Sequence, residues 1–373
     1  MAFVQQVLRV LALVPLVVMA VLAVVPVPTG ELWKPAIGAT EWGHVLALLA
    51  LGVAVPARGW RPDVGTYVAL AAALALLSPW ARSLPVDSEI RRDLMAAFGT
   101  DDVPFDGKIP GLGYVPPVVA KRLSAPDADG GPLRVDWYEG KRGAPLVVAI
   151  HGGSWNSGDP EQLVGMYQRL AAHGYHVAAL SYRLAPQHHY PTQERDIASV
   201  IAWLNRQPLG HDPKSLVLYG RSAGGHLALM HALTAHDAAI KGVLALYPIT
   251  DFDWSWDHPT DPRVADTFGT ITDLLGRRRE DDPDRKVFHA ASPFHQLHPD
   301  APPMLIAHGG RDELVFFEQS RRFVVAAKEK AIPCHLLALP WATHGFEANL
   351  DGPSGSLWTY AVDRFLERYA PVR

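Results

Sequence analysis

Apolar residues are unevenly distributed along the chain, and three long runs of them lie within residues 1–82. The first run covers residues 3–28 and carries no charge from position 10 onward, which is enough to cross the hydrocarbon core of a bilayer. The second and third runs cover residues 42–57 and 64–81. We therefore predict that residues 1–82 form an all-α membrane anchor with about three transmembrane helices.

Two alternatives apply to individual runs. The first run could be a cleaved signal peptide, but its single cation, Arg9, and its long apolar stretch argue against that interpretation. The second run carries His44 near one end, so a re-entrant or interfacial segment is the alternative there.

Charges in the connecting loops bear on orientation. Arg58 and Arg61 lie between the second and third runs and favour a cytoplasmic loop. Three crossings would then put the rest of the chain on the extracytoplasmic side, as an integral, multi-pass membrane protein. Arg82, Arg91 and Arg92 follow the third run and argue for the opposite orientation.

Beyond the apolar runs the pattern changes twice. Residues 83–120 are polar and rich in Pro and Gly, which indicates a linker or lid segment. Residues 121–373 alternate short apolar runs with stretches of helical periodicity, which predicts an α/β domain with a mostly parallel sheet covered by helices on both faces. The predicted strands are 133–138, 146–150, 176–182, 215–219, 242–247, 303–308 and 335–339, and helices include 193–205, 223–235 and 318–330.

Composition excludes several classes of function. The chain has 373 residues and a net charge of −4, so nothing in it indicates a nucleic-acid partner. A single cysteine, Cys334, excludes an internal disulfide framework and a cysteine-based zinc site.

The strongest chemical motif is G-R-S-A-G, centred on Ser222, between a predicted strand and a predicted helix. A G-x-S-x-G sequence in this context is typical of a nucleophile elbow, where a sharp turn exposes the serine hydroxyl. The two flanking glycines are needed because side chains there would collide with the strand and the helix.

A second motif, H-G-G-S-W, follows the predicted strand 146–150. Backbone N–H groups of Gly152 and Gly153, with that of Ala223 after the serine, could hold the oxyanion of a tetrahedral intermediate. Trp155 either packs beside this loop or lines the substrate pocket.

Two further residues complete the candidate chemistry. Asp312 follows the predicted strand 303–308, and His344 follows the last predicted strand. A serine hydroxyl needs a base during attack, and an imidazole held by a carboxylate supplies one. Ser222, Asp312 and His344 occur in the chain order of such a triad. Glu313 and Asp251 are the rival acids.

No metal or organic cofactor is implied by this chemistry. The segment D-F-D-W-S-W-D (251–257) is rich in acids and could suggest a metal site, but acidic and aromatic residues are also common in loops. We therefore predict no metal ligands.

Further motifs accompany the candidate triad: S-Y-R-L-A-P-Q-H-H-Y-P (181–191), Y-P-I-T-D (247–251) and P-P-M-L-I-A-H-G (302–309). With them, residues 146–369 resemble an α/β-hydrolase, and in particular the hormone-sensitive-lipase-like carboxylesterases. The resemblance implies a cap formed by residues 252–291 and a carboxylesterase or lipase-like activity on short- to medium-chain esters through an acyl-enzyme. The expected substrate is a small-molecule or lipid-like ester.

One position departs from that family's pattern. Ser154 replaces the third glycine of its usual H-G-G-G loop, and H-G-G followed by a larger residue and Trp is similar to arylformamidase-like members of the fold. An amidase, an acyltransferase or a non-catalytic binding domain are therefore the alternatives.

Because every motif lies downstream of residue 82, we expect a chain without residues 1–82 to stay active.

Overall fold

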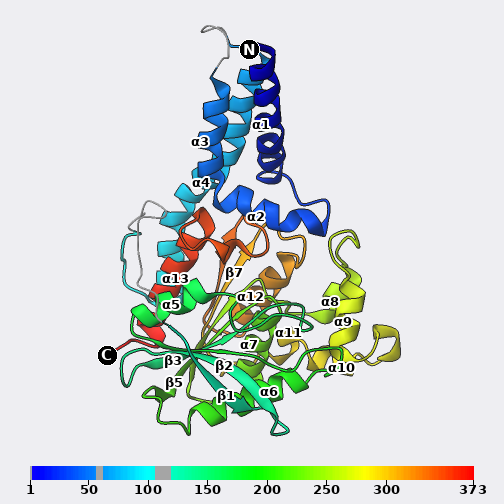
Figure 1. The fold of residues 1–373 in the computed structure, drawn as a ribbon. Coiled ribbons are helices and arrows are strands. Elements are labelled where there is room, and N and C mark those ends of the chain that lie inside the picture. Colours follow the sequence, from blue (N-terminus) through cyan, green and yellow to red (C-terminus); the bar gives the residue numbers. More distant parts are fainter. Residues whose placement is uncertain (1, 56–61, 106–118) are drawn as a thin grey trace.

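The computed structural model describes residues 2–55, 62–105 and 119–373. An eight-stranded sheet forms the centre of the larger part, with the strand order β1-β2-β4-β3-β5-β6-β7-β8 (Figure 1). β2 pairs antiparallel with β1 and β4, and all other neighbours are parallel. The strands are β1 (Lys121–Pro126), β2 (Pro132–Tyr138), β3 (Pro145–Ile150), β4 (His176–Leu180), β5 (Asp212–Arg221), β6 (Ile240–Leu246), β7 (Met304–Gly309) and β8 (Cys334–Leu339).

All seven predicted strands are present, within a few residues at their ends, and β1 is the strand that the sequence pattern did not predict. Half of its six residues are exposed and polar, and the strand lies at the edge of the sheet, where it pairs on one side only. Edge strands are commonly polar and charged, which prevents pairing with other molecules. Such a strand lacks the apolar run by which the others were recognised.

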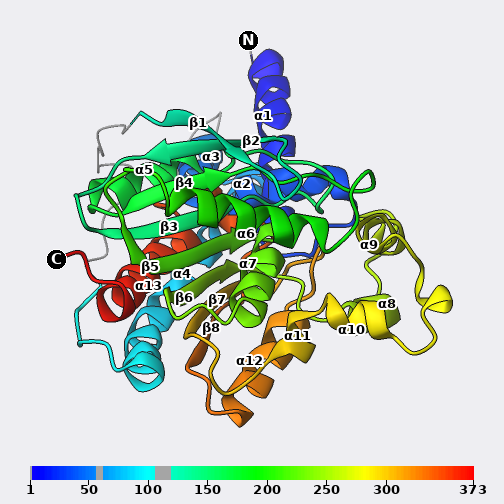
Figure 2. The ribbon, with the colours of Figure 1, turned by 90° about the horizontal axis from the view of Figure 1, so that it is seen from below.

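Helices cover both faces of the sheet, as predicted (Figure 2). Apolar side chains of α6 (Thr192–Leu204), α7 (Ala223–Thr234) and α12 (Glu318–Glu329) pack on one face. Those of α5 (Val164–Ala172) and α13 (Pro353–Tyr369) pack on the other. Burial of these two apolar layers is the main force that holds the sheet and helices together.

Between β6 and β7 the chain leaves the sheet and forms several short helices. They are α8 (Phe252–Asp257), α9 (Thr267–Leu275), η2 (Arg279–Asp281), α10 (Lys286–Ala290) and α11 (Pro293–Gln296). They lie together at one side of the sheet in Figure 1. This segment, which we call the cap, corresponds to the insertion predicted at residues 252–291.

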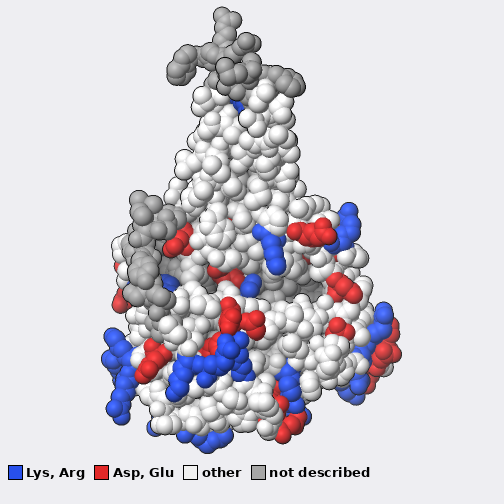
Figure 3. All heavy atoms as spheres, viewed as in Figure 1, with Lys and Arg blue, Asp and Glu red and all other residues white. Residues whose placement is uncertain are grey.

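The N-terminal helices project from the sheet domain as a stalk (Figure 1). We define the stalk as α1 (Ala2–Leu22), α3 (Gly43–Ala54) and residues 64–82 of α4 (Val64–Phe98). η1 (Gly30–Leu32) and α2 (Trp33–Glu41) lie at its base. Alanines dominate the contacts between the stalk helices, while their large apolar side chains face outward. Figure 3 shows almost no charge along the stalk.

The number of membrane spans differs from the prediction. Among the described residues, Val64–Val86 is long and apolar enough to cross a membrane. Residues 30–54 would pass the same test as one span bent by 81°, but α2 lies at the base of the stalk and only α3 belongs to the stalk itself. The apolar part of α1, Gln6–Leu22, falls short of the same length. α3 rises only about 18 Å, against a hydrocarbon core of about 30 Å. Length and composition therefore support one or two spans rather than three.

The predicted linker at residues 83–120 is wrong in its first part. α4 continues without a break to Phe98, and Ile90, Leu94 and Phe98 pack under the sheet with α13. These three apolar residues are spaced four apart and so form a stripe on one face of the helix. The charged residues Arg91, Arg92 and Asp93 between them made the segment look polar in the sequence. The rest of that segment from 106 to 118, and the orienting Arg58 and Arg61, lie outside the described residues.

Candidate active site

Ser222 lies in the turn between β5 and α7, in the backbone geometry expected of a nucleophile elbow. Its φ of 51° and ψ of −121° are rare for a residue with a side chain. A Cβ atom on Gly220 would lie 2.1 Å from the carbonyl oxygen of Gly224, and one on Gly224 would lie 2.1 Å from that of Ile150. The close approach of strand and helix thus requires both glycines, as the sequence analysis expected.

The H-G-G-S-W loop passes directly beside Ser222. A Cβ atom on Gly152 would lie 2.9 Å from the carbonyl oxygen of Arg221 and 3.3 Å from Cβ of Ser222. The next three residues, Gly153, Ser154 and Trp155, all have positive φ angles. Consecutive residues in this region are costly unless the surroundings hold them, and such strain is often found at functional sites.

One of the predicted oxyanion donors already has a partner. The N–H of Gly152 donates to Oε1 of Gln162 at 2.9 Å, and Gln162 lines the same cavity. Among the described residues, none accepts a hydrogen bond from the N–H of Gly153 or Ser154. Ala223 begins α7, so its N–H has no partner within the helix either. The free N–H groups beside Ser222 are therefore those of Gly153, Ser154 and Ala223.

Buried aromatic side chains support the loop from below. The imidazole of His151 stacks on Tyr182, with ring centroids 4.3 Å apart, and the Tyr182 hydroxyl donates to the carbonyl oxygen of His151. Burial lowers the pKa of His151 to about 4, so this histidine is neutral and structural. Trp155 is almost fully buried, and its indole N–H donates to His226 at 3.2 Å.

Asp312 and His344 lie together, as predicted from the motifs. Nδ1 of His344 is 2.7 Å from Oδ2 of Asp312, and both side chains are buried. The other carboxylate oxygen of Asp312 accepts the N–H groups of Leu314 and Val315 at 3.0 and 2.9 Å. These bonds fix the carboxylate on its loop and direct it at the imidazole.

The pKa of Asp312 reflects this environment. Burial alone would raise it, but the charge of His344 and hydrogen bonds from His308 and His344 hold it well below its ordinary value. His308 was not predicted as a site residue. Its Nε2 lies 3.4 Å from Oδ2 of Asp312, and its Nδ1 is bonded to Ser320 at 2.7 Å. The acid is therefore ionised, as an imidazole-orienting group must be.

The two rival acids have other contacts. Asp251 accepts the N–H of Trp254 at the start of α8 and pairs with Arg322 at 2.8 Å. Glu313 is half-buried on the same loop as Asp312, but the carboxylate that reaches His344 is that of Asp312.

A cluster of polar side chains that no sequence motif indicated, Tyr247, Glu347 and Arg221, lies next to His344. The Tyr247 ring is 4.0 Å from the His344 ring, and its hydroxyl donates to Glu347. Nε of Arg221, the residue before Ser222, lies 2.8 Å from Oε1 of Glu347. The arginine and glutamate come from the loops that carry Ser222 and His344, so their ion pair joins these two loops.

Ser222 and His344 line one cavity of about 500 Å³. Its apolar wall includes Trp155, Phe252, Trp254 and Leu314. Two aromatic residues of the cap, Phe252 and Trp254, therefore reach the site. Trp256 does not line the cavity and packs inside the cap against Phe268 and Phe288.

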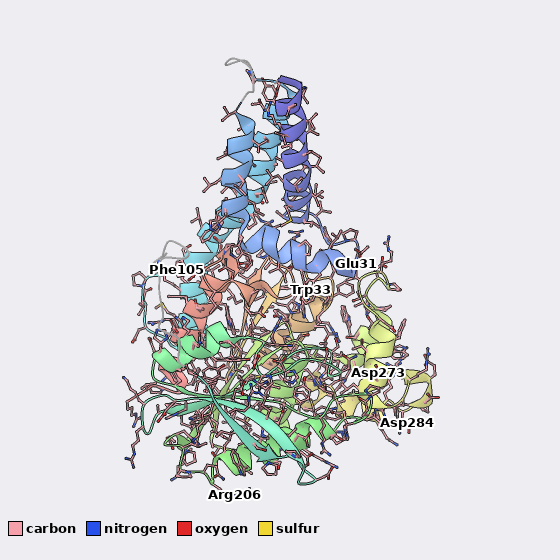
Figure 4. All side chains as sticks on the ribbon, viewed as in Figure 1. Glu31, Trp33, Phe105, Arg206, Asp273 and Asp284 are labelled. Carbon is pink, nitrogen blue, oxygen red and sulfur yellow. The ribbon has the colours of Figure 1, made fainter. Side chains whose placement is uncertain are left out.

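The N-terminal segment also lines this cavity, a contact that was not considered in the expectation that a chain without residues 1–82 stays active. Trp33 and Lys34 of α2 line the cavity beside His344. Figure 4 labels Trp33 at the base of the stalk, where it faces the sheet domain. A chain without residues 1–82 would lack this wall of the site. The sequence did not reveal it, because no motif marks where α2 would dock.

One group among the described residues has the composition of a metal site. Asp253, His289 and His295 of the cap bring potential ligand atoms within 4.8 Å of one another. Asp253 already pairs with Nε2 of His289 at 2.8 Å and with Arg285 at 3.4 Å. None of the three lines the cavity of Ser222.

Comparison with known proteins identifies relatives of this part of the chain. Esterase LipC of Mycobacterium tuberculosis (strain ATCC 25618 / H37Rv) is 32% identical over 240 residues, which is 60% of this chain and 58% of LipC. Esterase LipQ of the same strain is 29% identical over 225 residues, or 57% of this chain and 53% of LipQ. The chain thus spans about half the length of the curated relatives it matches.

A solved structure extends the likeness to three dimensions. Thermogutta terrifontis esterase 2 phosphonylated by sarin is 25% identical, covers 70% of this chain and 100% of its own, and has a TM-score of 0.57. A model of the BD-FAE family matches residues 138–326, just over half of the chain. The chain therefore belongs to the BD-FAE family and has the α/β-hydrolase fold.

Proposed function

We propose that this protein is a membrane-anchored serine hydrolase that cleaves short- to medium-chain carboxylic esters through an acyl-enzyme intermediate. The observation that carries the proposal is the pair His344–Asp312, 2.7 Å apart, on a cavity that also contains the strained Ser222. A nucleophile, a base and an orienting acid are the three groups that acyl transfer to serine requires.

The reaction has two halves. The hydroxyl oxygen of Ser222 attacks the ester carbonyl while His344 takes its proton, and Asp312 stabilises the resulting imidazolium. The N–H groups of Gly153, Ser154 and Ala223 hold the oxyanion, which is the largest electrostatic contribution expected at such a site. His344 returns the proton to the leaving alcohol. Water then attacks the acyl-enzyme by the same sequence of proton transfers.

The named relatives support ester substrates. LipC and LipQ are called esterases, and the T. terrifontis enzyme is an esterase that sarin phosphonylates. Sarin is an electrophile that traps activated nucleophiles, so its reaction with a structural neighbour agrees with the nucleophile proposed here. The cavity of about 500 Å³ lies within the range of small-molecule sites, and aromatic side chains of the cap form part of its wall.

The stalk supports the membrane part of the proposal. Most of the large apolar side chains that are exposed among the described residues lie on the N-terminal helices, which is a far larger apolar surface than water-soluble proteins usually expose. Small residues between the helices are typical of helix packing in membranes. Arg9, near the far end of the stalk, is mostly buried, where it donates to the carbonyl oxygen of Val53 and pairs with Asp63.

We place the far end of the stalk in the cytoplasm and the catalytic domain outside. The basis is the charge of Arg58 and Arg61 between α3 and α4 in the sequence. Protease treatment of sealed, right-side-out vesicles tests this orientation, since only an outward domain would be digested.

The activity is tested with full-length protein in detergent. We expect p-nitrophenyl butyrate to be hydrolysed, with kcat/KM far above that for the matching butyranilide. Ser222→Ala should remove the activity and leave the melting temperature unchanged, while Ser88→Ala, a change at an exposed serine on α4, should keep it. Comparable turnover of ester and anilide would favour an amidase, and full activity of Ser222→Ala would contradict the proposal.

A further inference from the structure

We propose that α2 is part of the catalytic centre, and that Trp33 is a positioning residue which holds His344 in place for catalysis. This inference rests on the proposed function. It makes the membrane-proximal segment a component of the active site instead of a tether that only fixes its location.

Trp33 touches the catalytic loop directly. Its indole N–H donates to the carbonyl oxygen of His344 at 2.5 Å. The two rings also meet edge to face, with centroids 5.9 Å apart and an angle of 62°. The Tyr247 ring also contacts the imidazole, with centroids 4.0 Å apart. The His344 ring is therefore in contact with one residue of the N-terminal segment and one of the sheet domain.

The residue after His344 makes the loop sensitive to this contact. Gly345 has a φ of 88°, which residues with side chains rarely adopt. A Cβ atom on Gly345 would lie 2.9 Å from Cδ1 of Ile37 and 3.4 Å from the Trp33 ring. α2 thus packs against the most deformable point of the loop, and limits the backbone movement that Gly345 would otherwise allow.

The loop that carries Asp312 is tied to the same segment. Arg311, directly before the acid, donates through Nη1 to the carbonyl oxygen of Ala23 at 2.7 Å. Its Nη2 donates to the carbonyl oxygens of Leu22, at 2.9 Å, and Val25. The last carbonyls of a helix have no partner within it, and a buried cation is a favourable partner there. The end of α1 and the start of α2 therefore hold both members of the His344–Asp312 pair.

Both ends of the N-terminal connection are anchored on the rest of the molecule. The N–H of Gly30 donates to the carbonyl oxygen of Arg263 in the cap. At the other end, the carboxylate of Glu41 accepts from the Ser354 hydroxyl at 2.7 Å, and Asn349 donates to the Glu41 carbonyl. These contacts fix α2 in one position over the catalytic loops, which a positioning role requires.

The test compares Trp33→Phe with Trp42→Phe in the full-length protein in detergent. Phenylalanine keeps an aromatic ring against Gly345 but lacks the donor to His344. Trp42, which follows α2, is partly exposed and does not line the cavity, so it is the matched control. Arg311→Lys is the second variant, because lysine keeps the charge but cannot bond to several carbonyls at fixed angles.

We expect Trp33→Phe to lower kcat for p-nitrophenyl butyrate about tenfold, the loss that one hydrogen bond typically carries, with KM and melting temperature unchanged. Rates are expressed per serine titrated by a fluorophosphonate, so misfolded protein does not count. Arg311→Lys should lower kcat in the same way, and Trp42→Phe should not.

The inference is overturned if Trp33→Phe has the kcat of Trp42→Phe, or if its loss of rate disappears once rates are expressed per titrated serine. These outcomes are separate from failure of the proposed function. If the proposed function were wrong, the unaltered protein itself would neither hydrolyse esters nor react with the fluorophosphonate.

Discussion

Nδ1 of His344 lies 2.7 Å from Oδ2 of Asp312, although the two residues are 32 positions apart and follow different strands. The strands are β7 and β8, which are parallel neighbours at the end of the sheet, so their C-terminal loops meet at one edge. Ligand and catalytic sites of open α/β sheets form at that edge.

This pairing predicts that substitution of Asp312 lowers kcat far more than substitution of the other two candidate acids. Asp312→Asn should lower kcat by about 10³- to 10⁴-fold, because an amide holds the imidazole in the wrong tautomer. Glu313→Gln is the control on the same loop and should stay within about twofold, the scatter usual for changes away from the reacting groups. Steady-state kinetics with an aryl ester measures both. If Asp251→Asn were the crippling change, the acid would belong to the loop after β6.

The aromatic side chains of the cap in the cavity wall predict a preference in acyl-chain length. Each added methylene contributes about 0.8 kcal/mol while it is buried, and nothing once the pocket is full. We expect kcat/KM for p-nitrophenyl esters to rise from acetate to butyrate or hexanoate and then to fall.

Trp254 lies on the apolar wall of the cavity and is only partly buried. Trp254→Ala should therefore move the optimum to longer chains, while Trp256→Ala, inside the cap, should not extend it. A wild-type profile that still rises at palmitate would show an open groove instead of a closed pocket.

Glu41 predicts a pH dependence of the contact between α2 and the sheet domain. Burial raises its pKa from 4.5 to about 8, against the opposing hydrogen bonds from Ser354. At pH values between 4.5 and about 8, Glu41 is protonated in the folded protein but ionised in the unfolded chain. The free energy of unfolding should therefore fall as pH rises from about 4.5 to 8.

Thermal unfolding of the full-length protein in detergent measures this effect. Glu41→Gln should flatten the decrease across that range, whereas Glu31→Gln, at an exposed position of η1, should leave it unchanged. An equal slope in Glu41→Gln and the unaltered protein would show that Glu41 does not hold the proton.

The apolar stalk predicts integral membrane association. Full-length protein should remain in the membrane fraction after extraction with high salt or carbonate, which remove proteins held by charge alone. Detergent should release it. Recovery in the carbonate supernatant would contradict the membrane part of the account.

The strands, and the loops that carry the three candidate catalytic residues, could be predicted because their signals are local. Seven of the strands contain clusters of apolar residues, and Ser222, Asp312 and His344 follow such strands within a few residues. The contacts of Trp33 with His344, and of Arg311 with the end of α1, join positions more than 280 residues apart. No local pattern encodes them, because they depend on where the stalk docks.

The oxyanion loop shows a subtler limit. The sequence indicated backbone donors at Gly152 and Gly153, but it could not show that the side chain of Gln162, ten residues later, occupies the N–H of Gly152. The choice between neighbouring N–H groups depends on backbone angles that the residue types alone leave open. Gly152 is needed instead for its small size beside Ser222.

The central claim is that Ser222 is the nucleophile, and covalent labelling tests it most directly. Full-length protein is treated with a fluorophosphonate, digested and analysed by mass spectrometry. The account predicts one equivalent of adduct on the peptide that contains Ser222, and none in Ser222→Ala. A stoichiometric adduct on another residue, or undiminished labelling of Ser222→Ala, would contradict it.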